Sequence, residues 1–174
     1  MTTANDNILA DKVAALLAEK KMVMLDTLAQ ACGVSELQAA EALPQPMRAF
    51  AAAADFDAIW ADLTAWESAT FIMRHGGSVV EIKGQIPAGK HGGGYFNLNY
   101  GCPLGGHICS NNIARMAFLS LPFMGLESHS IQFFDAAGAV VFSIYVGREN
   151  RALIPSVKER FLALRAALGK ENMQ

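Results

Sequence analysis

Histidine is the side chain of this sequence best suited to chemistry near neutral pH, and its distribution is uneven. The four histidines, His75, His91, His107 and His129, all lie in the β-rich half of the chain. Neutral imidazole is a common metal ligand, but none of these histidines has the HxH or HExxH spacing that forms a local zinc site. The metal chemistry that remains is one or two axial donors to an iron held by a macrocycle, as in haem.

Haem binding also requires a broad apolar surface and cations that pair with the propionates. The stretches ARMAFLSLPFMGL (114–126) and SIQFF (130–134) are rich in Phe, Met and Ile and are predicted to supply that surface. Phe123 and Met124 belong to it, and Met124 is interpreted as a packing residue rather than a thioether ligand. The candidate cations of this half of the chain are Arg74, Lys83, Lys90 and Arg115.

Composition limits the classes of protein to which the chain belongs. Its 174 residues suit one domain, and 52% hydrophobic against 17% charged residues excludes intrinsic disorder. Lys and Arg number 14 against 16 Asp and Glu, a net charge of -2, so we expect no nucleic-acid partner. The stretch 113–126 contains Arg115 and is shorter than the ~20 apolar residues of a membrane span, so we expect no membrane insertion.

The N-terminus and the cysteines indicate the compartment. Acidic Asp6 and Asp11 stand where a secretory signal would carry positive charge. The three cysteines form no CxxC pair, which fits reduced thiols rather than a disulfide framework or a zinc site. We therefore expect a cytoplasmic protein.

Hydrophobic periodicity predicts the elements that position these residues. Helical spacing predicts short helices over 8–43, a second helical stretch over 56–69 and an amphipathic helix over 155–168. Between residues 70 and 147, six β-rich runs separated by Gly, Pro or Asn predict an antiparallel sheet. These runs are TFIMR, SVVEIKGQI, GYFNLNY, ARMAFLSL, SIQFFDA and AVVFSIYVG.

Two local patterns add detail to the predicted sheet. The glycines of GKHGGGYF lack the GK[ST] of a phosphate loop and indicate a mobile or tightly turning loop that leads into a strand. In the last run, Val140, Phe142, Ile144 and Val146 alternate with other residues and are predicted to share one buried face. We expect an α+β fold: a large antiparallel sheet flanked by helices, with an N-terminal helical segment and a C-terminal amphipathic helix. Residues 1–174 then form a single domain, with the helical segment at 8–45 and the sheet core at 50–170.

The N-terminal segment LDTLAQACGVSELQAAEAL resembles a helix-turn-helix, with Ser35 as the N-cap of its last helix. That helix offers Glu36, Gln38 and Glu41 and no Lys or Arg, and carboxylates repel a phosphate backbone. A structural helical cap is therefore favoured over a transcriptional regulator, which stays as an alternative.

Two longer runs carry a family resemblance. GQIPAGKHGGGYFNLNYGCPLGGHI and PFMGLESHSIQFFDAAGAVVFSIYVGR resemble the HutX/ChuX/ShuX family of cytosolic haem-utilisation carrier proteins, over about residues 50 to 165. Its distinctive pieces are GYFNL, GGHI, FMG and YVGR. The resemblance implies a sheet like half of the HemS/ChuS-type proteins, a homodimer, and haem as a transported ligand that is handed to a haem-degrading enzyme. A haem-degrading enzyme is the alternative function.

The resemblance also implies ligands. His107 occupies the GGHI position that the family uses as a proposed haem ligand, the alternative being a hydrogen-bonded structural histidine. A second proposed family histidine lies seven residues before Glu81, where this chain has Arg74, with His75 one place later. Because successive strand residues point to opposite faces, His75 reaches the same face only if a bulge follows it.

Two further residues are candidate donors. His129 follows the FMG turn, where other family members are expected to carry a tyrosine ligand, and shares a strand face with Ile131 and Phe133. Tyr95, in GYFNL, is a candidate oxygen donor to ferric iron. His107 and His129 are the leading predicted iron ligands, and the carrier hypothesis requires no covalent chemistry from the protein.

Overall fold

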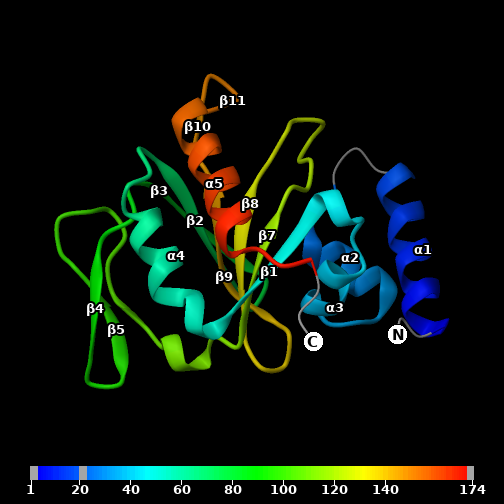
Figure 1. The fold of residues 1–174 in the computed structure, drawn as a ribbon, viewed down its shortest axis with the longest axis horizontal. Coiled ribbons are helices and arrows are strands. Elements are labelled where there is room, and N and C mark those ends of the chain that lie inside the picture. The colour runs from blue at the N-terminus through cyan, green and yellow to red at the C-terminus, as the bar shows by residue number, and fades with distance from the viewer. Residues whose placement is uncertain (1–3, 20–22, 172–174) are drawn as a thin grey trace.

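A six-stranded antiparallel sheet with the strand order β1-β7-β8-β9-β2-β3 forms the centre of the molecule (Figure 1). The structure is a computed structural model and describes residues 4–19 and 23–171. The six strands are β1 (Arg48–Ala52), β2 (Ala69–His75), β3 (Ser78–Gly84), β7 (Arg115–Leu119), β8 (Ser130–Phe134) and β9 (Val140–Val146). The predicted α+β class is confirmed, but β1 is absent from the predicted set because its sequence, RAFAA, has little β-propensity.

Two helices cover the first face of this sheet: α4 (Phe56–Leu63) and α5 (Pro155–Leu168). Helix α5 has the predicted bounds, and Pro155 begins it because the first helical position needs no backbone N–H. Under α4 the ring of Trp60 lies 6.4 Å from that of Phe133 and 6.2 Å from that of Phe142. These aromatic contacts form the centre of the larger hydrophobic core.

The N-terminal helices cover part of the second face. Helices α1 (Ala4–Glu19), α2 (Leu25–Cys32) and α3 (Glu36–Glu41) pack over β1, β7 and the end of β8 in a second hydrophobic cluster. Ser35 is the N-cap of α3, as predicted, and forms a capping box with Gln38. Glu36 accepts a hydrogen bond from the backbone N–H of Val140, and Glu41 lies 2.5 Å from Arg115. Both carboxylates of α3 therefore contact the sheet.

A bulge changes the predicted face of β9. The register of β8 with β9 shifts between Phe133, which pairs with Phe142, and Phe134, which pairs with Val140. The extra residue turns Val140 into the cluster under the N-terminal helices, whereas Phe142 and the alternate residues after it stay in the larger core. The prediction that Val140 shares their face is therefore wrong.

A separate three-stranded sheet projects beside α4 (Figure 1). It comprises β4 (Gly89–Gly92), β5 (Tyr95–Leu98) and β6 (His107–Ile108). Gly93 and Gly94, with φ of 61° and 84°, form a tight turn, the second of the two predicted alternatives, because a type I′ hairpin requires positive φ at both central residues. On its inner face Phe96 packs against Phe56 and Trp60, which attaches this sheet to the body.

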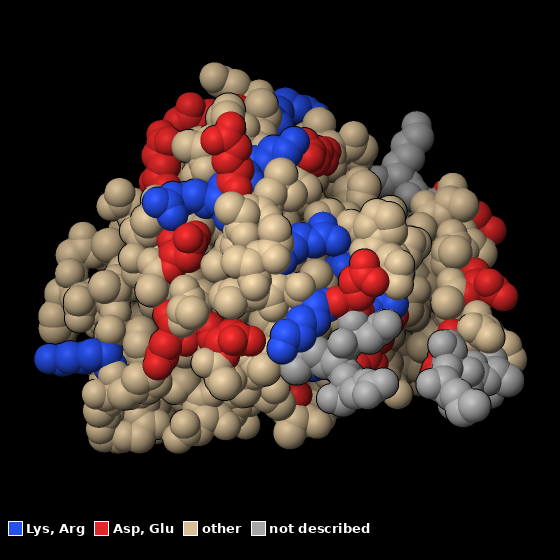
Figure 2. Space-filling view, viewed as in Figure 1, with Lys and Arg blue, Asp and Glu red and all other residues tan. Residues whose placement is uncertain are grey.

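The remaining elements are short. Strands β10 (Arg148–Glu149) and β11 (Ala152–Leu153) form a hairpin before α5, and the 3-10 turns are Gln45–Met47, Ala53–Asp55 and Ser110–Asn112. Within residues 4–19 and 23–171, no helix has the length and apolar character that a membrane span requires. On the face shown in Figure 2, basic and acidic side chains are interspersed rather than gathered by sign.

Candidate functional site

The outer face of the small sheet brings three predicted site residues together. Lys90 pairs with Asn97, and Asn97 pairs with His107, so these three side chains form one row across the strands. Tyr95 lies two residues before Asn97 and therefore on the same face. We call Lys90, Tyr95, Asn97 and His107 the His107 face. The predicted cation, phenol and imidazole thus share one surface.

His107 is exposed on this face and is held at one ring nitrogen. Its Nδ1 lies 2.7 Å from Oδ1 of Asn97, and its ring centroid lies 6.0 Å from that of Tyr95. Within the described part of the chain, Nε2 of His107 has no hydrogen-bond partner. The imidazole therefore presents to solvent a nitrogen able to ligate a metal.

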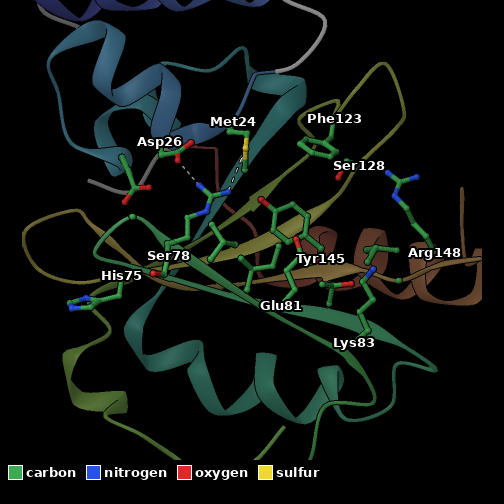
Figure 3. A pocket seen from close by; sticks show the side chains of 18 of the residues that line it. Met24, Asp26, His75, Ser78, Glu81, Lys83, Phe123, Ser128, Tyr145 and Arg148 are labelled. Atoms are coloured by element: carbon green, nitrogen blue, oxygen red, sulfur yellow. Dashed lines mark hydrogen bonds and ion pairs between the residues drawn. The ribbon is translucent and has the colours of Figure 1, made fainter. Parts of the chain in front are cut away.

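The second face of the large sheet contains an open cavity of about 910 Å³. Its floor consists of β2, β3 and β9, beyond the part that the N-terminal helices cover, and we call it the sheet cavity (Figure 3). The floor residues are Thr70, Ile72, Arg74, Val79, Glu81, Lys83 and Tyr145. The walls include Met24, Asp26 and Glu36 from the N-terminal helices, Phe123 and Ser128 from the β7–β8 connection, and Arg148.

The middle of the sheet cavity contains Ile72, Tyr145 and the carboxyl group of Glu81, which pairs with Ile72 across β2 and β3, and both ends carry charged residues. In Figure 3, Lys83 and Arg148 lie toward one end, Asp26 and His75 toward the other, and Tyr145 between them. On the wall, burial raises the pKa of the Glu36 carboxyl, against the hydrogen bond that it accepts from the backbone. The two cations at one end, Lys83 and Arg148, suit a ligand with anionic groups along one edge.

Four predicted residues, Arg74, His75, Lys83 and Phe123, line the sheet cavity. The guanidinium of Arg74 lies 2.7 Å from the carboxylate of Asp26 and is thus already paired. The register of β2 with β3 continues without a shift to the end of the hairpin, so no bulge turns His75 onto the floor. His75 lies at the end of the cavity, at the tip of the hairpin.

His129, predicted as an iron ligand, lies in the core instead. His129 is 6% exposed, and its ring stacks on the ring of Phe161 in α5, with the two ring centroids 4.9 Å apart. Nδ1 lies 2.9 Å from Oγ of Ser120, and Nε2 lies 3.0 Å from a carboxylate oxygen of Glu127. Burial lowers the pKa of the imidazole, against the opposing effect of Glu127. The geometry therefore gives His129 a structural role and leaves no ring nitrogen free for iron.

Arg115 and Met124 also lie apart from both surfaces. The guanidinium of Arg115 pairs with Glu41 and lies 4.5 Å above the ring of Phe50, so it holds the N-terminal helices rather than a propionate. Met124 lies in a tight turn with φ of 51° and is 62% exposed, outside the residues that line the sheet cavity.

The predicted porphyrin surface is largely occupied. In the stretches 114–126 and 130–134, the central Met, Phe and Ile side chains face α4 and α5 or the N-terminal helices. Sequence reasoning missed Thr70, Ile72 and Tyr145 as site residues. The alternation of side chains along β2 could have identified Thr70 and Ile72, because both point to the face of the sheet opposite that of the core residue Phe71.

Comparison with known proteins assigns the chain to a family. Residues 49–164 match the family described as Haem utilisation ChuX/HutX. The intracellular heme transport protein HutX of Vibrio cholerae serotype O1 is 39% identical over 158 residues, which cover 90% of this chain and 82% of that protein. This chain belongs to the ChuX/HutX haem-utilisation family.

Solved structures agree with this assignment. The heme binding protein ChuX has a TM-score of 0.80 and 28% identity, over 89% of this chain and 97% of that one. The heme degrading enzyme ChuS of Escherichia coli O157:H7 has a TM-score of 0.74 and 13% identity, over 94% of this chain but 48% of that one. The second comparison shows the fold alone and confirms the predicted likeness to half of a ChuS-type protein.

The lowered pKa of His129 predicts a pH dependence of stability. As pH falls below about 6.5, the unfolded chain binds a proton before the buried imidazole does, so His129 lowers the free energy of unfolding. Between about pH 7.5 and pH 5.5, the wild type should lose more stability in urea titrations than His129→Gln, which cannot take the proton. Equal losses in the two proteins would contradict this role.

Proposed function

We propose that this chain is a haem carrier of the cytoplasm that accepts imported haem and delivers it to a haem-degrading enzyme. Haem is its cargo, and no covalent chemistry is required of the protein. The observation that carries the proposal is the exposed His107 imidazole, whose Nε2 has no partner in the described part of the chain. The printed name of the 39% identical relative, an intracellular heme transport protein, supports it.

The His107 face needs a second surface to hold a porphyrin. Ligand sites bury most of their ligand between apolar walls, whereas Tyr95 is 49% exposed and both Lys90 and His107 are exposed. The sheet cavity offers apolar side chains on its floor, Ile72 and Tyr145, and on its walls, Met24 and Phe123, and about 910 Å³ is large enough for a macrocycle. Within one chain, however, His107 is absent from the residues that line the cavity.

We infer that a homodimer joins these two surfaces. His107 of the partner subunit would ligate the iron of a porphyrin that lies in the sheet cavity. Lys83 and Arg148 at one end of the cavity would then meet the propionates. Val79 on the floor of the cavity and Phe123 on its wall are 56% and 37% exposed and supply apolar area there for contact between subunits.

This arrangement suits a carrier because it makes release feasible. A single axial ligand on an open sheet face can be displaced by a ligand from an acceptor protein. A cavity between subunits also opens when the subunits separate. Haem affinity should therefore be intermediate, well below that of an enclosed permanent cofactor.

Removal of the proposed ligand should weaken haem binding. In haemin titrations followed by Soret absorbance, we expect His107→Ala to change the band and raise the Kd by at least about tenfold. The matched control is His91→Ala, because His91 is an exposed histidine on the inner face of the same sheet, where it contacts Asp57. A His107→Ala spectrum identical to that of the wild type would reject this ligand.

The shared site predicts complementation between two defective variants. We expect haem binding to be impaired in His107→Ala and in Ile72→Asp, which places a charge on the cavity floor. Mixed dimers, isolated with a different tag on each variant, should regain about one haem per dimer, because one of their two sites is intact. Mixed dimers as defective as the single variants, or a monomeric wild type in light scattering, would contradict the shared site.

The carrier hypothesis also predicts that bound haem is chemically stable. With an electron donor, oxygen and catalase present, the Soret band of the loaded protein should persist over the time in which a haem-degrading enzyme removes it. A steady loss of the band under these conditions, with free haemin as the control, would support the enzymatic alternative instead.

A further inference from the structure

Asn97 occupies the middle of the His107 face, and the orientation of its amide is fixed. The amide nitrogen lies 2.9 Å from the backbone oxygen of Gly92 and 3.3 Å from those of Lys90 and Tyr95. Backbone oxygens only accept hydrogen bonds, so the NH₂ group must face them. A turned amide would place Oδ1 against three oxygens. The Oδ1 atom therefore faces His107, at 2.7 Å from Nδ1.

This orientation decides which nitrogen of His107 carries the proton. An amide oxygen only accepts, so Nδ1 must donate, and a neutral imidazole has one N–H. The lone pair is thus on Nε2, on the side of the ring away from Asn97. We propose that Asn97 is a positioning residue that holds His107 in the tautomer and orientation that present Nε2 as a metal ligand.

The consequence for haem rests on the proposed function, whereas the tautomer does not. A hydrogen bond at the remote nitrogen is a usual companion of metal-ligating histidines, because it fixes the ring and raises the basicity of the ligand. The competing explanation is that Asn97 only closes the β4–β5 turn through its NH₂ contacts. Two substitutions separate these roles. Asn97→Ala removes both the NH₂ donors to the turn and the oxygen acceptor for His107. Asn97→Asp loses the donors to the turn but keeps an acceptor for His107.

The first test needs no haem. In two-bond proton–nitrogen NMR spectra of the apoprotein, His107 should be protonated on Nδ1 in the wild type and in Asn97→Asp, and should lose this preference in Asn97→Ala. Asn99→Ala, an exposed asparagine two residues further on, should leave the tautomer unchanged. A wild-type His107 protonated on Nε2, or an unchanged tautomer in Asn97→Ala, would overturn the proposal.

The second test uses haemin titration of the same variants. We expect Asn97→Ala to weaken binding by about 10- to 100-fold, with Asn97→Asp and Asn99→Ala close to the wild type. If Asn97→Asp binds as poorly as Asn97→Ala, the residue acts through the turn and the positioning role is wrong. If His107→Ala leaves the haem spectrum unchanged, the proposed ligation fails, and the apoprotein tautomer still decides whether Asn97 positions the imidazole.

Discussion

The unequal burial of the two faces of the large sheet determines most of this structure. Helices α4 and α5 seal the first face around Trp60, Phe133 and Phe142, whose rings lie 4.3–6.4 Å apart. The second face is covered by the N-terminal helices only over β1, β7 and the end of β8. Since side chains alternate along a strand, β2 and β9 supply the core with one set of residues and the sheet cavity with the other.

The N-terminal helices form a wall of this cavity. Asp26 at the start of α2 pairs with Arg74 on the floor, and Glu36 and Glu41 of α3 contact the sheet backbone and Arg115. The family match begins at residue 49, after these helices. The segment that resembles a helix-turn-helix therefore contributes to the cavity through Asp26 and through Glu36, one of the two carboxylates that make its last helix unsuited to a phosphate backbone.

The small sheet serves a different purpose from the large one. Phe96 attaches its inner face to Phe56 and Trp60, so its outer face is exposed to solvent. A metal ligand on such a face is accessible to another protein, and its orientation comes from a neighbouring strand rather than from a surrounding pocket. Both properties suit a protein that passes its ligand on.

The sequence by itself predicted the α+β class, the bounds of α5, the Ser35 cap, the glycine turn of β4–β5 and the family. These features depend on residues two to four apart, or on short motifs, and such signals are local. No local pattern in the sequence indicated the bulge that turns Val140 to the other face, because a prediction from alternating side chains assumes that the strand is regular.

Only the tertiary structure decided which apolar face is sealed and which histidine is free. His129 and His107 are the same residue type in similar strand patterns, yet α5 packs on one and both of its nitrogens are engaged, whereas the other stays exposed. Asn97 and His107 are ten residues apart and meet only because β5 pairs with β6. Contacts of this kind depend on how distant segments pack, and the spacing of residues along the chain does not indicate which distant segments will meet.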